Sequence, residues 1–152
     1  MMKKYILLLL TLVPIAVGYL SNTLWVIPWL GNLFFTIAPW ATLVFWFFLG
    51  SKFAETSWNV VVSTLIANVT GILSLVVYVW QFWFVASEAR NIPLAMTSQW
   101  FSASVPMYFF GRIVLMFTSQ TDAIMLAMQV ISVAVMLLVF LCGYWMGKRR
   151  AK

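Results

Sequence analysis

The near-absence of charge between the two ends constrains this chain more than any other feature. Between Lys4 and Lys148 only six charged side chains occur, and long apolar runs fill the intervals between them. They are Lys52, Glu55, Glu88, Arg90, Arg112 and Asp122. A charge at the centre of a bilayer is costly, whereas Leu, Ile, Val and Phe insert favourably, so a membrane-embedded chain keeps its charges at the ends of its apolar segments. The pattern predicts an all-α, polytopic transmembrane helical bundle.

Composition and length limit the number of crossings. Hydrophobic residues make up 64% of the chain and charged residues 8%, against roughly half and a quarter in soluble domains. A crossing uses about 20 residues plus a connection, so a chain of 152 residues holds four or at most five spans in one domain.

The apolar runs give the expected boundaries within a single membrane domain covering residues 1–152. We expect spans at about residues 5–22, 33–50, 58–85 and 123–146. The first run also fits a cleavable signal peptide, with Ala16 and Gly18 as small residues at the cleavage position. Pro14 and the apolar stretch that continues after Leu20 favour a retained span instead.

The segment 92–118 is only moderately apolar, since it contains Pro93, Pro106, several serines and Arg112. Basic residues flanking apolar spans are retained on the cytoplasmic side, and this chain has them at both ends, which requires an even number of crossings. We therefore predict four spans in the cell (inner) membrane with both termini cytoplasmic, and an interfacial or re-entrant segment at 92–118. The alternative is five spans with one basic terminus outside.

The net charge of +6 is placed at the termini, in Lys3 and Lys4 and then in Lys148, Arg149, Arg150 and Lys152. Such clusters meet anionic lipid headgroups. No basic stripe with interleaved aromatic residues occurs elsewhere, so nucleic acid is not an expected partner. The nine tryptophans are expected near the two membrane surfaces as anchors.

The sequence offers no constellation for catalysis. It contains no histidine and a single cysteine, Cys142, and its acids Glu55, Glu88 and Asp122 belong to different connections. Membrane enzymes need a titratable cluster or a nucleophile beside a base. We therefore predict no catalytic site, no metal site and no cofactor.

The third apolar run carries a stripe of small and polar residues at steps of three or four, which places them on one helical face. The members of this polar stripe are Ser63, Ala67, Thr70, Ser74, Tyr78 and Gln81. Small and hydroxylic residues let helices approach closely, so the stripe is first interpreted as an internal packing seam. The functional alternatives are a docking face for another membrane protein and one wall of a polar path for a solute.

Arg112 is the second candidate, because an arginine inside an apolar stretch must reach the interface, a lipid phosphate or an acid. It is expected on the same side as Glu88 and Asp122. One interpretation is an interfacial anchor, and the other is a bidentate contact to an anionic group.

A few short motifs resemble a known family. Thr36, Ala38 and Pro39 open an apolar span that ends at Lys52; Gly111 with Arg112, and then Asp122 with Ala123, follow later. These positions resemble the Thr-Ala-Pro span and the Gly-Arg to Asp-Ala stretch of the colicin A-type immunity proteins. The resemblance implies a four-span inner-membrane protein, with both termini inside, that blocks a pore-forming toxin helix to helix.

Two functions follow from these observations. The first is an accessory, regulatory or protective protein that acts through helix contacts with another membrane protein, or through self-association. The second is a small oligomeric channel or transporter component for a solute or ion, with the polar stripe along its path.

Overall fold

The computed structural model describes residues 4–24, 26–115, 117 and 121–150, except for the side chains of residues 109, 112, 115 and 121. Within this part the regular secondary structure consists of helices, without strands. The helices are α1 (Lys4–Leu10), α2 (Val13–Leu24), α3 (Pro28–Phe53), α4 (Val60–Val79) with its π-helical extension (Trp80–Phe84), a 3-10 turn (Ser87–Ala89), α5 (Ile92–Thr97), α6 (Trp100–Ala103), α7 (Pro106–Leu115) and α8 (Thr121–Arg150).

Four helical stretches are long and apolar enough to cross a membrane, which confirms the predicted four-span bundle. They cover Lys4–Leu24, Pro28–Phe53, Val60–Phe84 and Asp122–Arg150. The second stretch begins at Pro28 and not at residue 33, because proline is tolerated in the first turn of a helix, where its missing N–H has no intrahelical partner to lose.

The first stretch is broken between α1 and α2. Pro14 lacks the N–H that a continuous helix would use, and its ring disturbs the preceding turn. The amides of Thr11 and Leu12 therefore donate to the carbonyls of Leu8 and Leu9, at 3.2 and 3.1 Å, in a tighter turn. The first stretch therefore consists of two short helices.

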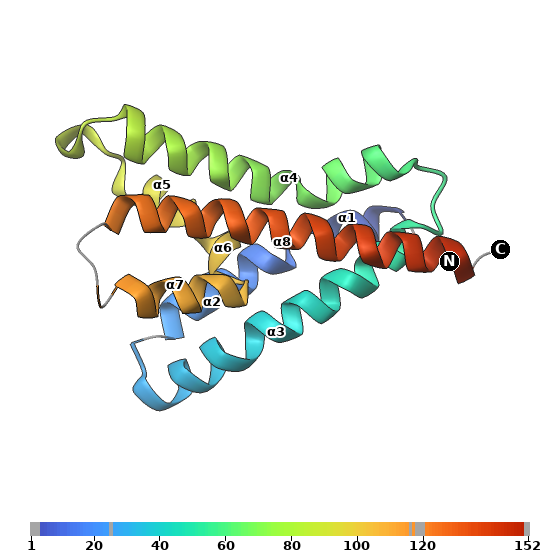
Figure 1. Ribbon diagram of the computed structural model, residues 1–152, viewed down its shortest axis with the longest axis horizontal. Helices are drawn as coiled ribbons and strands as arrows, with labels where there is room; N and C mark the ends of the chain where they lie inside the picture. Colours follow the sequence, from blue (N-terminus) through green and yellow to red (C-terminus); the bar gives the residue numbers. More distant parts are fainter. Residues whose placement is uncertain (1–3, 25, 116, 118–120, 151–152) are drawn as a thin grey trace.

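Helix α8 is the central element, since it packs against α3, α4 and α7 (Figure 1). Its contact with α3 is the most extensive in the bundle. At this crossing Gly143 meets the carbonyl of Phe47, and a Cβ at Gly147 would lie 2.6 Å from the carbonyl oxygen of Ser51. On α3, Gly50 meets the carbonyl of Phe140 in the same way. Glycines on both helices bring the two backbones together, as small residues do in membranes.

The described part of the segment 92–118 folds inside the bundle, as a re-entrant segment would. Helices α5, α6 and α7 lie between the spanning helices in one half of the bundle, and α6 contacts α2, α4 and α8 (Figure 1). Every residue from Phe101 to Pro106 is buried. Irregular backbone at membrane depth is tolerated only where protein surrounds it, and this burial supplies that condition.

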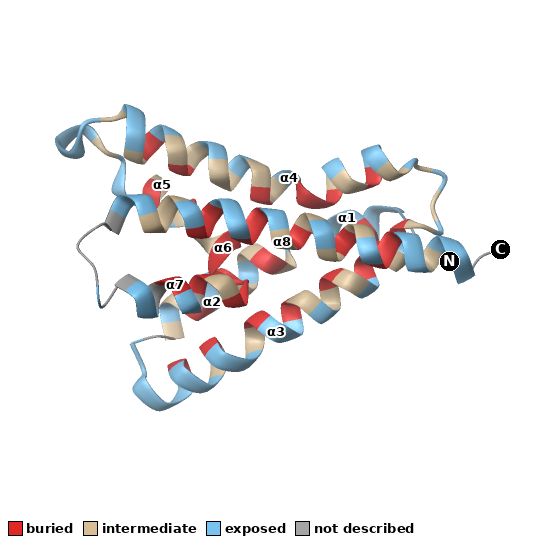
Figure 2. Ribbon diagram, viewed as in Figure 1, coloured by how far each residue is buried: buried red, intermediate tan, exposed pale blue. Residues whose placement is uncertain are grey.

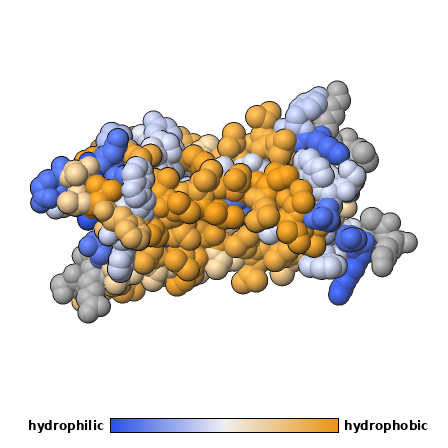
Figure 3. Space-filling model, turned by 90° about the horizontal axis from the view of Figure 1, so that it is seen from above, coloured by the Kyte–Doolittle hydropathy of each residue, from blue (hydrophilic) through white to orange (hydrophobic). Residues whose placement is uncertain are grey.

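Burial and hydropathy are arranged as in a lipid-embedded protein. Buried residues face the inside of the bundle, around large aromatic side chains such as Trp46, Phe53 and Phe140 (Figure 2). Large apolar residues also point outward, with Leu73 57% and Leu138 62% exposed. Figure 3 shows a broad hydrophobic surface across the middle of one face, with hydrophilic side chains gathered at both ends.

The start of α1 and the end of α8 lie at the same end of the bundle, here named the terminal end (Figure 1). Lys4 Nζ donates to Ser57 Oγ at 2.9 Å, and the Tyr144 hydroxyl donates to the Trp58 carbonyl at 3.2 Å. These bonds join α1, the loop between α3 and α4, and α8. The loop after α4 and the start of α8 lie at the other end, here named the opposite end.

One tryptophan departs from the expected interfacial belt. Trp46 is fully buried in the core, whereas Trp29, Trp80, Trp83 and Trp145 are each more than half exposed. A partner for the Trp46 indole N–H inside the bundle explains the difference, as described below. Trp25 lies outside the described residues.

Candidate functional site

The fold turns most of the polar stripe inward. Ser63, Ala67, Tyr78 and Gln81 are buried, so four of the six predicted positions face the chain's own helices. The remaining two, Thr70 and Ser74, are half-buried and line a crevice. The stripe thus follows one face of α4 and its extension. Only its middle residues, Thr70 and Ser74, line a crevice.

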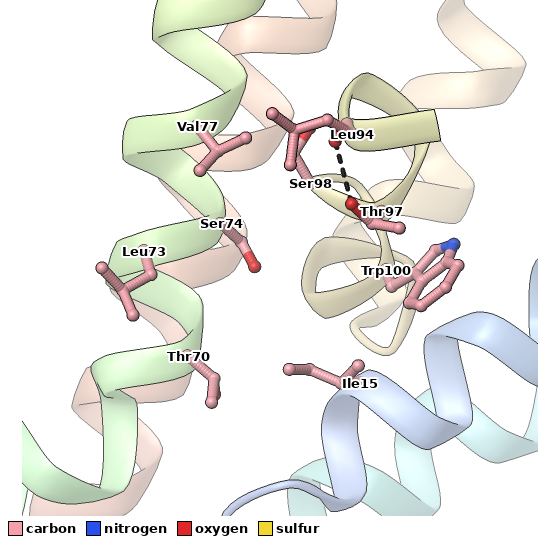
Figure 4. Close-up of a pocket in the computed structure, with 9 residues that line it drawn as sticks. All are labelled: Ile15, Thr70, Leu73, Ser74, Val77, Leu94, Thr97, Ser98 and Trp100. Atoms are coloured by element: carbon pink, nitrogen blue, oxygen red, sulfur yellow. Dashed lines mark hydrogen bonds between the residues drawn. The ribbon is translucent and has the colours of Figure 1, made fainter. Parts of the chain in front are cut away.

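This crevice lies between α2 and α4 and is bounded at one end by α5 and α6 (Figure 4). Its volume is about 280 Å³. Ile15 of α2 and Thr70 of α4 point toward one another across it. The lining residues are Ile15, Thr70, Leu73, Ser74, Val77, Leu94, Thr97, Ser98 and Trp100.

The hydroxyl groups of the crevice differ in their hydrogen bonding. Thr97 and Ser98 donate to the carbonyls of Leu94 and Ala95, at 2.9 and 2.7 Å. The Thr70 Oγ1 atom is buried and has no hydrogen-bond partner within the described part of the chain. A buried polar atom without a partner costs free energy, and hydrocarbon cannot supply one.

The re-entrant segment is held in place by close backbone packing and one buried side-chain bond. Gly18 of α2 lies against the backbone of Trp100, and Gly71 of α4 lies against the Phe101 ring. The Ser102 hydroxyl donates to the Gln129 Oε1 atom of α8, and both side chains are fully buried. Gln129 Nε2 and Ser132 Oγ have no partner among the residues described.

Asn68, which borders the stripe, contacts the core tryptophan. Trp46 Nε1 donates to Asn68 Oδ1 at 3.3 Å, and Asn68 Nδ2 donates to the carbonyl of Thr64 at 3.0 Å. A buried indole needs such an acceptor, so Trp46 can lie in the bundle without leaving its N–H unsatisfied.

Arg90, which is not among the predicted site residues, caps the end of the third span. Its Nε and Nη2 atoms donate to the carbonyls of Gln81 and Phe82, at 3.1 and 3.3 Å, and its guanidinium lies 4.9 Å from the centre of the Phe82 ring. Gln81 Oε1 accepts from the Asn91 amide at 2.9 Å. One feature of the sequence indicates this role: a basic residue shortly after an apolar run can donate to the last carbonyls of the helix.

The acidic residues are separated as expected. Glu55 pairs with Lys52 at 2.7 Å at the terminal end, whereas Glu88 follows α4 at the opposite end and Asp122 lies in the first turn of α8. Hydrogen bonds from its own backbone N–H and from Ser87 lower the pKa of Glu88, and the charge of Arg90 lowers that pKa further. No group of three potential metal ligands occurs among the described residues.

Arg112 falls outside what the structure describes, apart from its place in the backbone of α7. Its contact with an anionic group stays a prediction.

No protein-family model, no curated protein and no solved structure matches this chain.

Proposed function

We propose that this protein is a non-enzymatic accessory, regulatory or protective protein of the cytoplasmic membrane that acts by helix contacts with another membrane protein. The observation that supports this is the crevice between α2 and α4, where two spanning helices are separated and Thr70 Oγ1 has no partner in the described chain.

A transmembrane helix is the occupant that matches this site. Its apolar side chains fit against Ile15, Leu73 and Val77, which lipid would also contact. Small and hydroxylic residues such as Thr70 and Ser74 also allow a second helix to approach α4 closely. The resemblance of the Thr36 to Lys52 span to colicin A-type immunity proteins agrees with helix-to-helix action.

The proposed orientation places the terminal end in the cytoplasm. Among the described residues this end carries Lys4, Lys52, Lys148, Arg149 and Arg150 with only Glu55 as an acid. The opposite end has the basic residues Arg90 and, in the backbone of α7, Arg112, together with the acids Glu88 and Asp122. The distribution of basic residues is what sets orientation in membranes.

Site-specific photo-crosslinking in native membranes tests the proposal. A photoreactive amino acid at Ser74 is expected to give one discrete protein adduct whose mass differs from that of crosslinked copies of this chain. The matched control is Leu138 on α8, which is 62% exposed and outside the crevice. Adducts to lipid alone, or the same adducts from both positions, contradict the proposal.

A channel or transporter component is the second candidate, and buried polar atoms favour it. Ser63 Oγ, Gln129 Nε2 and Ser132 Oγ lack partners among the described residues, and re-entrant segments commonly line transport paths. With Cys142 replaced by Ser, single cysteines at Ser63, Thr70 and Ser74 distinguish the two functions. Reaction of all three with a water-soluble thiol reagent indicates a hydrated path and rules out the purely protein-binding function.

A further inference from the structure

At the terminal end, a lysine from each end of the chain lies over an aromatic ring, the half-buried Trp58 in one case and the buried Tyr144 in the other. Lys4 Nζ lies 5.3 Å from the centre of the Trp58 ring, and Lys148 Nζ lies 5.9 Å from the centre of the Tyr144 ring. The Tyr144 hydroxyl donates to the Trp58 carbonyl at 3.2 Å and so joins the two halves. Lys4, Trp58, Tyr144 and Lys148 form the lysine–aromatic row.

The charge of this row is not neutralised by the protein. Lys4 donates to the Ser57 hydroxyl, and in the described chain neither Lys4 nor Lys148 lies within ion-pair distance of a carboxylate. The acid at this end, Glu55, is paired with Lys52 at 2.7 Å. The row therefore presents two ammonium groups to an external anion.

An apolar hollow lies between α4 and α8, close in sequence to the aromatic residues of the row. It is formed between the first turns of α4 and the facing part of α8, and its volume is about 270 Å³. Its lining residues are Val60, Val61, Thr64, Leu65 and Leu141. Val60 is two positions after Trp58, and Leu141 is three positions before Tyr144, so the hollow and the row belong to the same contact between α4 and α8. A ligand with a phosphate and an alkyl chain spans both.

We propose that the lysine–aromatic row and the hollow between α4 and α8 form a binding site for an anionic phospholipid. The phosphate lies between the ammonium groups of Lys4 and Lys148, and one acyl chain occupies the hollow beside Val61 and Leu65. Trp58 and Tyr144 lie at the interfacial level that indole and phenol rings prefer. Basic pockets between membrane helices on the cytoplasmic side bind phospholipid headgroups by the same electrostatic principle.

Native mass spectrometry of the purified protein in detergent tests this site, with phosphatidylglycerol and phosphatidylcholine of identical chains as probes. The unaltered protein is expected to retain phosphatidylglycerol in preference to phosphatidylcholine. The double variant Lys4→Gln, Lys148→Gln is expected to bind phosphatidylglycerol about tenfold more weakly or worse, since each lysine near a membrane surface contributes of order a fivefold change in affinity.

The matched control removes the same amount of charge from the same end. The variant Lys52→Gln, Arg150→Gln is expected to change phosphatidylglycerol binding by less than about threefold, because in detergent these two charges are outside the lysine–aromatic row and do not contact the phosphate. An equal loss in both double variants overturns the proposal, since binding then reflects general surface charge.

Two further measurements complete the test. The variant Lys4→Arg, Lys148→Arg keeps both charges and is expected to retain most of the binding, which separates loss of the site from loss of the fold. Glycerol phosphate has the charged group without the acyl chains. Competition by glycerol phosphate at concentrations comparable to the lipid overturns the lipid site in favour of a site for a soluble anion.

Discussion

The indole N–H of Trp46 on α3 donates to the side-chain carbonyl of Asn68 on α4 at 3.3 Å, and both residues are fully buried. The bond joins two consecutive spans within the core, on the side that they share with α8. Because surrounding hydrocarbon offers no replacement partner, this bond also fixes how the two helices are rotated about their axes.

Loss of the Asn68 acceptor is therefore expected to destabilise the bundle. Asn68→Leu leaves the Trp46 N–H buried without a partner, at a cost of about 1–2 kcal/mol in the free energy of unfolding. Unfolding in mixed detergent micelles measures it. The same substitution at the exposed Asn32 of α3 is the control, and equal effects at the two positions contradict the role assigned to the bond.

The close crossing of α3 and α8 predicts strong sensitivity at Gly143. Gly143→Val places a branched side chain against the backbone of Phe47, and separating the helices is expected to cost about 1–3 kcal/mol. Ala134→Val on the exposed face of α8 is expected to be nearly neutral. Thermal unfolding in detergent compares them, and a tolerated Gly143→Val variant rules out this crossing.

Helix α4 and the re-entrant segment are coupled through Gly71 and Phe101. A Cβ at Gly71 would lie 2.5 Å from Cε1 and Cζ of the Phe101 ring, so Gly71→Ala is expected to displace the segment. Hydrogen exchange of the amides at 101–105 is expected to accelerate by about tenfold, because the displaced segment opens locally at a lower cost in free energy. Adding Phe101→Leu shortens the side chain and restores slow exchange in part.

The exposed Val69→Ile on the same helix adds one carbon toward lipid and is the control for this experiment. Unchanged exchange in Gly71→Ala, or equal acceleration in both variants, contradicts the coupling.

The proposed orientation predicts one-sided labelling of the two ends. With Cys142 replaced by Ser, a cysteine at Asn91 is expected to react with an impermeant thiol reagent added outside intact cells or spheroplasts. A cysteine at Ser57 is expected to react only after permeabilisation, because it lies beside Lys4 at the terminal end. Labelling of Ser57 from outside reverses the orientation.

The Glu88 carboxyl is expected to titrate below its ordinary pKa, because its own backbone N–H and the Ser87 hydroxyl, at 2.8 Å, stabilise the charged form. The charged Glu88 therefore stabilises the Ser87–Ala89 turn at pH values above the pKa of the unfolded chain. This stabilisation is lost as the pH falls through the lower pKa of the folded state. Ser87→Ala is expected to raise the pKa of Glu88, as read from the carboxyl chemical shift in an NMR titration. An unchanged pKa excludes the contribution of the hydroxyl.

The sequence by itself determined the number of spans, and it allowed for the re-entrant segment. Hydropathy indicates how long each apolar segment is and how deep it lies in the membrane. The bilayer acts as the solvent, so each segment must form its backbone hydrogen bonds internally and keep its charges at the surface. The weakly apolar, proline-containing segment 92–118 was recognisable as different for the same reason. The charges also predicted both termini on one side of the membrane, which the labelling experiment above tests.

Only the tertiary structure decided which face of each helix meets which neighbour. An apolar side chain is equally stable in lipid and in the protein core. Hydropathy therefore could not predict the burial of Trp46 or the crossing of α3 with α8 at Gly143. The same ambiguity applied to the polar stripe, of which Ser63 faces the protein while Thr70 lines an open crevice. In a membrane, the rotation of a helix is set by the fit of small residues and by hydrogen bonds between side chains, and these exist only once the helices are packed.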